Sequence, residues 1–121
     1  MGQVVHFELS VPRPEEAAAF YSAVFGWSAQ KLPDPVKYWQ LCPSAEGGAR
    51  GIPGGIVQSK TGAARVSITV EVDSLEEVVA KVTRHGGVLV TEPRSVPGYG
   101  VHVLCRDPQG CFFALLEPGS K

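Results

Sequence analysis

The chain has 121 residues, of which 44% are hydrophobic and 19% charged, and its formal net charge is −1 at pH 7. This length and composition predict a single domain with a core large enough to fold without disulfides or bound metal. The balanced charge argues against nucleic acid or an anionic membrane as a partner, and no apolar run is long enough to span a bilayer. Because a strand pattern starts at once and leaves no room for a signal peptide, we expect a cytoplasmic protein.

The first predicted element is a strand over residues 4–11, VVHFELSV, in which apolar and polar side chains alternate. Alternation of this kind is typical of a strand with one buried face. Val5, Phe7 and Leu9 are expected to pack under a helix. The polar side chains on the other face are those of His6, Glu8 and Ser10. They either begin a functional site or simply face water.

A helix is predicted to follow, because apolar residues recur at helical spacing between Pro14 and Gly26. A proline is tolerated in the first helical turn, and a glycine is a common helix end. Two aromatic residues on the apolar stripe, Phe20 and Tyr21, are predicted to be core residues rather than part of a ligand site.

Two shorter strands, KYWQLCP and GGIVQS, complete the first half, with the glycine-rich SAEGGARGIPGG between them. No Lys-Ser or Lys-Thr pair follows these glycines, so they are read as turns and not as a phosphate loop. Tyr38, Trp39 and Gln40 are candidates for the wall of a ligand cavity, and the sequence leaves open which of them point into it. Trp39 is taken into the predicted site.

The second half repeats this order. One gapless offset brings Val72 onto Val11 and Gly87 onto Gly26, and it also aligns the acidic first turns of the two helices. Such a match predicts a duplicated unit. The second helix is expected to have Asp73 as its N-cap, with Glu76 completing a capping box. Three strands should follow, GVLVTEPRSV, GVHVLCRD and GCFFALLE, so that the modules span about residues 1–59 and 65–121.

The three cysteines, Cys42, Cys105 and Cys111, are an odd number without CxxC spacing. This pattern indicates neither a disulfide framework nor a zinc site. We expect small buried thiols, although Cys105 and Cys111 flank a predicted turn and stand close in the resulting hairpin.

The stretch HFELSVPRPEEAAAFYSAVFGW and the closing CRDPQGCFFALLE resemble the vicinal oxygen chelate superfamily, which includes glyoxalases, bleomycin-resistance proteins and dioxygenases. The wording is closest to small single-domain members of that superfamily. The resemblance implies an α+β fold of two βαβββ modules that form a cupped eight-stranded mixed sheet with the helices on its outer face. It also implies a homodimer and a ligand, or a metal ion, inside the cup.

In metal-dependent members of the superfamily, a His or Gln on each first strand and a Glu on each last strand bind a divalent ion. The resemblance places these positions at His6, at Ser67 and at Ala114, while the last strand of module one, GGIVQS, has no carboxylate. Glu117 is expected on the opposite side of its strand from Ala114. Because protein metal sites need about three ligands, no metal cofactor is predicted, and a divalent ion is disfavoured. A rearranged site would have to use Glu8 or His102.

The expected cavity is lined by polar and apolar side chains, which suits a small organic molecule. His6 and Glu8 are the candidate catalytic residues, about 6–7 Å apart on one strand face. The candidate ligand-binding residues are Ser10, Trp39, Ser67, Thr69, Glu71, Phe112 and Ala114. Three functions remain open: a metal-free small-molecule-binding protein, a metal-free isomerase or lyase, and a metal-dependent glyoxalase or dioxygenase with an atypical site.

Overall fold

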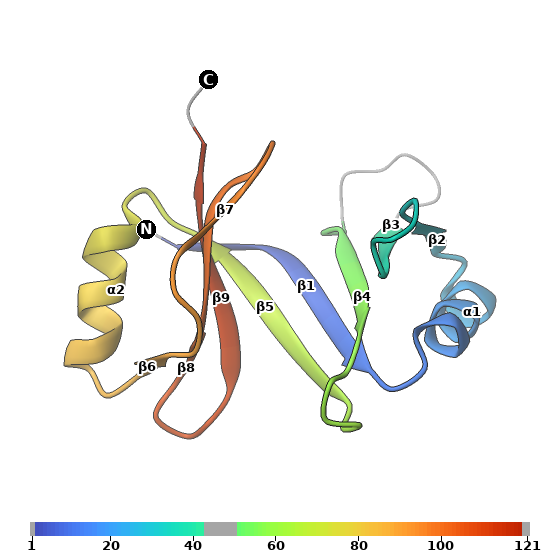
Figure 1. Ribbon diagram of the computed structural model, residues 1–121, viewed down its shortest axis with the longest axis horizontal. Coiled ribbons are helices and arrows are strands. Elements are labelled where there is room, and N and C mark those ends of the chain that lie inside the picture. The colour runs from blue at the N-terminus through green and yellow to red at the C-terminus, as the bar shows by residue number, and fades with distance from the viewer. Residues whose placement is uncertain (1, 43–50, 120–121) are drawn as a thin grey trace. The chain divides into compact units, whose positions relative to one another are not determined.

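Figure 1 shows the computed structural model, which describes residues 2–42 and 51–119. The chain forms two compact units, one from His6 to Val66 and the other from Ser67 onward together with the residues before His6. We call them module one and module two. The residues before His6, expected in module one, cluster with module two, and Arg65 and Val66, expected at the start of module two, cluster with module one.

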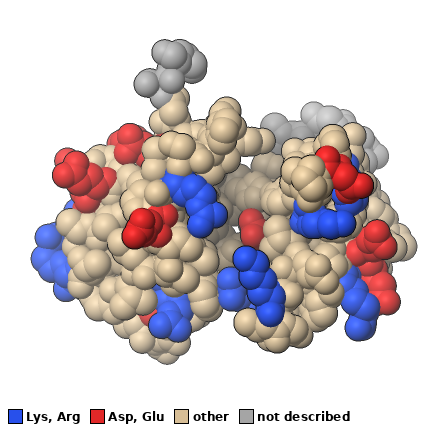
Figure 2. All heavy atoms as spheres, in the orientation of Figure 1, with Lys and Arg blue, Asp and Glu red and all other residues tan. Residues whose placement is uncertain are grey.

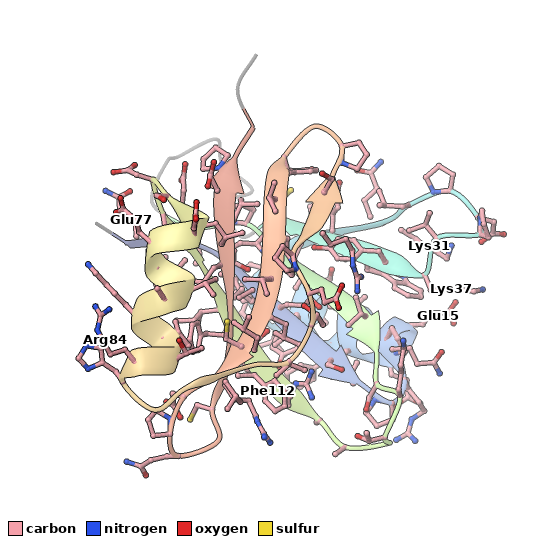
Figure 3. All side chains as sticks on the ribbon, turned by 60° about the vertical axis from the view of Figure 1, so that its left-hand side comes forward. Glu15, Lys31, Lys37, Glu77, Arg84 and Phe112 are labelled. Atoms are coloured by element: carbon pink, nitrogen blue, oxygen red, sulfur yellow. The ribbon has the colours of Figure 1, made fainter. Side chains whose placement is uncertain are left out.

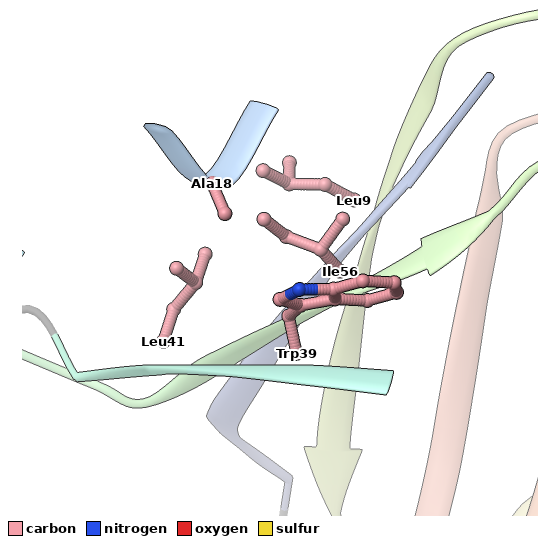
Figure 4. Packing of buried hydrophobic residues seen from close by; sticks show 5 residues of the cluster. All are labelled: Leu9, Ala18, Trp39, Leu41 and Ile56. Atoms are coloured by element: carbon pink, nitrogen blue, oxygen red, sulfur yellow. The ribbon is translucent and has the colours of Figure 1, made fainter. Parts of the chain in front are cut away.

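Module one contains β1 (Gln3–Val11), α1 (Pro14–Phe25), β2 (Ser28–Lys31), β3 (Tyr38–Cys42) and β4 (Gly54–Gln58). Its strands lie in the order β2-β3-β4-β1, with β1 parallel to β4 and the other pairs antiparallel. Helix α1 packs against β2, β3 and β4. Figure 4 shows the core between the helix and the sheet, which consists of Leu9, Ala18, Trp39, Leu41 and Ile56.

Helix α1 begins at Pro14 and is closed by Gly26, whose φ of 73° is left-handed and whose N–H donates to the carbonyl of Ser22. Tyr21 stacks on Trp27 with ring centroids 5.5 Å apart and packs against the core, as predicted. The prediction for Phe20 was wrong, because 56% of this residue is exposed. Helix α1 therefore has apolar surface that is not buried within module one.

Module two contains β5 (Arg65–Glu71), α2 (Leu75–Arg84), β6 (Val88–Leu89), β7 (Arg94–Val96), β8 (Gly100–Arg106) and β9 (Phe112–Pro118). β5 is parallel to β9, β9 is antiparallel to β8, and both β6 and β7 pair with β8. The core cluster consists of Val72, Leu75, Val103, Cys105 and Leu115. Val70 packs against this cluster as expected, whereas Ile68 is 40% exposed and does not.

The stretch 87–96, expected as one strand, is interrupted between β6 and β7. There the side-chain oxygen of Thr91 accepts a hydrogen bond from the N–H of Leu104, 3.0 Å away. The N–H groups of Val90 and Thr91 both donate to the Leu104 carbonyl. Because these bonds replace the regular ladder, the residues described contain nine strands where the sequence predicted eight.

The start of helix α2 corrects a second expectation. Its N-cap is Ser74, not Asp73, and the Ser74 side chain accepts from the N–H of Glu77. Glu117 of β9 provides another acceptor, with Oε1 2.8 Å from the N–H of Leu75. Glu77 therefore lies in the first turn of α2 and Arg84 at its other end (Figure 3), as the helix dipole favours.

The α+β class with two βαβββ modules is confirmed. The three cysteines are free, but only Cys105 is buried, so the expectation of buried thiols was wrong for Cys42 and Cys111. Between Asp107 and Cys111, the predicted hairpin turn is stabilised by the Asp107 carboxylate, which accepts from the N–H groups of Gln109 and Cys111. Much of the glycine-rich connection, including Gly47, Gly48 and Arg50, lies outside the residues that the structure describes.

Charges of both signs are interspersed on the face of the molecule in Figure 2, without a large basic patch. That distribution agrees with the formal net charge of −1. Within residues 2–42 and 51–119, no helix is long and apolar enough to cross a membrane.

Candidate ligand-binding site

The strand register of module one determines which side chains share a sheet face, because directly paired residues point to the same side. Glu8 and Gln40 both pair with Gly55, and Ser10 and Tyr38 both pair with Val57. The core residues Leu9, Trp39 and Ile56 point to the opposite face of the sheet. We call the face opposite α1 the open face of module one. Its side chains come from His6, Glu8, Ser10, Tyr38, Gln40 and Val57.

This register answers the question that the sequence left open about β3. Tyr38 and Gln40 belong to the open face, whereas Trp39 is 9% exposed and lies in the hydrophobic core (Figure 4). The assignment of Trp39 to the ligand site is therefore corrected. The alternation used for β1 could have predicted this, since the apolar Trp39 and Leu41 of YWQLC lie on the same face of the strand.

A hydrogen bond joins β3 to β1 across the open face. The hydroxyl of Tyr38 lies 3.2 Å from Nε2 of His6, and either atom donates according to the imidazole tautomer. Strand β4 lies between β3 and β1, so the phenol must pass over β4. It does so at Gly55, where a Cβ would overlap the Tyr38 ring. The phenol of Tyr38 and the imidazole of His6 thus come together because Gly55 has no side chain between them.

The carboxyl group of Glu8 is shielded from water on the same face. Burial raises the pKa of Glu8, and the positive charge of Arg65 partly opposes this rise. Arg65 is therefore close enough for its charge to act on Glu8. A carboxyl group with a raised pKa keeps its proton to higher pH and can then donate a hydrogen bond as well as accept one.

The equivalent face of module two has a different character. Thr69 pairs with Ala114, and both are buried, while Glu71 pairs with Leu116. Arg106 lies over the ring of Phe112 at 5.8 Å. Burial and then the neighbouring Arg94 lower the pKa of His102, which favours a neutral imidazole. The predicted residues Ser67, Thr69, Glu71, Phe112 and Ala114 share this face, which also carries the apolar Leu104 and Leu116.

The positions that the resemblance assigns to metal ligands hold His6, Ser67 and Ala114, while the last strand of module one, β4, provides no carboxylate. Glu117 is committed to the N-terminus of α2. Within residues 2–42 and 51–119, no three His, Cys, Asp or Glu side chains are grouped so that they could hold a metal ion. The residues present do not fit the superfamily's usual ligand set.

An open pocket of about 540 Å³ adjoins the open face at the end of β4. Its lining residues are Lys37, Val57, Gln58, Ser59 and Lys60. Val57 lines the pocket and also belongs to the open face. Lys37 lies beside the start of β3 (Figure 3). Sequence reasoning missed both lysines, because nothing in their local pattern distinguishes them from ordinary surface lysines.

Comparison with known proteins identifies the same fold. The glyoxalase-like domain family matches residues 5–116. "Putative glyoxylase CFP32" of Mycobacterium tuberculosis is 27% identical over 121 residues, which are 99% of this chain and 46% of that protein. The chain thus spans about half the length of this curated relative.

Two solved structures are also similar. One is a Mn(II)-bound glyoxalase from Novosphingobium aromaticivorans, with a TM-score of 0.69 and 20% identity over 100% of this chain and 42% of that one. The other is a glyoxalase/bleomycin resistance protein/dioxygenase superfamily member from Vibrio splendidus, with a TM-score of 0.67 and 16% identity over 97% of this chain and 99% of that one. At these identities the likeness concerns the fold alone.

Proposed function

Because this chain belongs to the glyoxalase-like domain family of the vicinal oxygen chelate superfamily, we propose that it binds a small organic molecule on the open face of module one, without the usual metal site. The observation that carries the proposal is the polar cluster built by His6, Glu8 and Tyr38 on a sheet face that α1 leaves uncovered. Polar groups that converge on a sheltered surface are typical of small-molecule sites.

The chemistry of the cluster favours an oxygen-rich ligand. The Tyr38 hydroxyl, the Glu8 carboxyl and the amide of Gln40 supply both donors and acceptors. The neighbouring pocket adds the ammonium groups of Lys37 and Lys60, which attract a carboxylate. A small hydroxy acid or keto acid combines these two features.

The proposal that binding needs no metal rests on the small number of side chains that could coordinate one. A divalent ion held by one imidazole has little affinity, since stable sites use about three protein ligands. Ser67 and Ala114 lack a strong ligand atom, and β4 provides no carboxylate. We therefore propose that direct hydrogen bonds from the protein perform the task that the metal performs in metal-dependent members.

The test is calorimetric titration with a panel of 2-hydroxy and 2-oxo carboxylic acids in the presence of EDTA. We expect saturable binding that weakens at least tenfold in Tyr38→Phe and in Glu8→Gln. A matched control is His102→Gln, because His102 has the register position of Tyr38 in module two. Binding that requires added Mn(II), or that is lost only in His102→Gln, would contradict the proposal.

A second candidate function is metal-free acid–base catalysis, as in an isomerase or lyase. The observation that favours it is the raised pKa of Glu8, which lies beside His6 on the proposed ligand face. Its test is deuterium exchange at the carbon next to the carbonyl of the bound 2-oxo acid. Exchange that survives EDTA and disappears in Glu8→Gln supports catalysis, and exchange that needs Mn(II) supports the metal-dependent alternative.

We also propose a homodimer that works in the cytoplasm with its cysteines reduced. Phe20, Val24 and Phe25 of α1 are each more than half exposed and provide an apolar surface for a second copy. Light scattering after gel filtration tests the dimer, which Phe20→Lys combined with Phe25→Lys should convert to a monomer. A monomeric unmodified protein at micromolar concentration would contradict it.

A further inference from the structure

Module one contains an arrangement that ligand binding alone does not require, the passage of Tyr38 over Gly55. The phenol reaches from β3 across β4 to the imidazole of His6 on β1. This path is available only because residue 55 has no side chain, as a Cβ there would overlap the phenol ring. The glycine is buried and extended, so a left-handed backbone does not explain it.

The register identifies what position 55 corresponds to in the other module. In module one, Glu8 of β1 pairs in parallel with Gly55 of β4. In module two, Thr69 of β5 pairs in parallel with Ala114 of β9, and the gapless sequence offset places Thr69 at the position of Glu8. Gly55 and Ala114 are therefore equivalent, and Ala114 is the position where the superfamily places a metal-binding glutamate.

We propose that Tyr38 takes the place of the missing carboxylate, so that the Tyr38–His6 pair is a metal-independent substitute for half of the superfamily's metal site. The phenol fills the space above Gly55, and its hydroxyl occupies Nε2 of His6. The pair then forms a hydrogen bond with a ligand oxygen, which a metal ion would coordinate in metal-dependent members. This role assumes the proposed ligand face, but the pair itself is testable without any ligand.

The geometry makes Gly55 and Tyr38 dependent on each other. Gly55→Ala should force the phenol aside and lower the melting temperature by roughly 5 °C, the usual cost of overpacking in a domain of this size. Tyr38→Phe removes the hydroxyl, the atom nearest to the added Cβ, but keeps the ring carbons that also overlap it, so it should leave most of this cost in place. Tyr38→Ala removes the ring, so adding Gly55→Ala to it should cost about a third as much or less.

The decisive experiment is long-range proton–nitrogen NMR of the three histidines in the intact protein. Tyr38→Phe should shift the ring nitrogen signals of His6 and leave those of His85 and His102 in place. One equivalent of Zn(II) should not perturb His6 in the unmodified protein, since the phenol occupies Nε2. Signals of His6 that do not respond to Tyr38→Phe, or that shift at equimolar Zn(II), would overturn the proposal.

These readouts separate the pair from ligand binding. If the His6 signals respond as expected but no hydroxy or keto acid binds, the proposed function fails while the substitution of the metal site stands. If the acids bind in EDTA but His6 coordinates Zn(II), the reverse is true. The thermal cycle between Gly55 and Tyr38 provides a third, independent outcome, and equal costs of Gly55→Ala with and without the phenol ring would contradict the proposal.

Discussion

The two modules share one framework but differ on their open faces. The same strand registers place Trp39 and Val103, Leu41 and Cys105, and Ile56 and Leu115 at equivalent core positions. On the open faces, Tyr38 corresponds to His102, Gln40 to Leu104 and Gly55 to Ala114. The core positions are apolar in both modules because their side chains pack against a helix. In the part of the chain that the structure describes, the open faces pack against no helix of their module, and their residues differ. The hydrogen bond between Tyr38 and His6 lies on the open face of module one.

The helices differ as well. Helix α2 has two acceptors at its N-terminus, from Ser74 and Glu117. Helix α1 has none from its N-cap residue Arg13 and begins instead with a proline. Module two therefore secures its helix by polar capping, and module one relies on aromatic packing around Tyr21 and Trp27.

The largest predicted effect tests whether the two cores are equally important. Ile56 and Leu115 are 0% and 2% exposed and occupy equivalent positions. Ile56→Ala and Leu115→Ala should each lower the free energy of unfolding by about 2–5 kcal/mol, because each leaves a cavity. Urea denaturation measures both. A cost below about 1 kcal/mol for either variant would show that the cores are not equivalent.

The next effect concerns the capping of α2. Glu117→Ala should cost about 1–2 kcal/mol in urea denaturation, since it removes a charged acceptor from the Leu75 N–H. Glu117→Gln should recover part of that loss, because the amide oxygen can accept the same bond. If Glu117→Ala were neutral, the carboxylate would be available for another role, and its assignment as a helix cap would be wrong.

Glu8 provides a pH-dependent prediction for the open face. Its pKa is raised in the folded protein, so ionisation favours the unfolded state as pH rises. Glu8→Gln does not titrate and should therefore raise the melting temperature at about pH 8, with a gain that shrinks to nothing near pH 3. Thermal melts across this range measure it. A gain that grows toward low pH would mean that the pKa of Glu8 is depressed.

The smallest effect is expected at the start of α1. Arg13 and Glu16 form an exposed salt bridge of 2.9 Å, and their side chains are 74% and 71% exposed. Arg13→Ala should change the free energy of unfolding by less than about 0.5 kcal/mol. A loss as large as that of Glu117→Ala in the same denaturation assay would remove the contrast between the two helix starts.

The sequence was sufficient for the fold and for the common face of His6 and Glu8. Alternation in β1 and the gapless repeat predicted both modules, and alternation placed His6 and Glu8 on a common face. It failed where tertiary contacts override local pattern. Phe20 lies on an apolar helix stripe, yet the helix buries a neighbouring stripe instead. The Tyr38–His6 bond joins residues of separate strands, and only the strand register shows that Gly55 lets the phenol pass.

We propose that module one, and not module two, holds the ligand. The most direct measurement is the change in backbone amide signals when the 2-hydroxy and 2-oxo acids are added in EDTA. We predict that shifts concentrate on β1 and β3, around Glu8 and Tyr38, and spare His102 and Leu104. Shifts concentrated on β8 and β9, or the absence of shifts in module one with every acid of the panel, would contradict binding on the open face of module one.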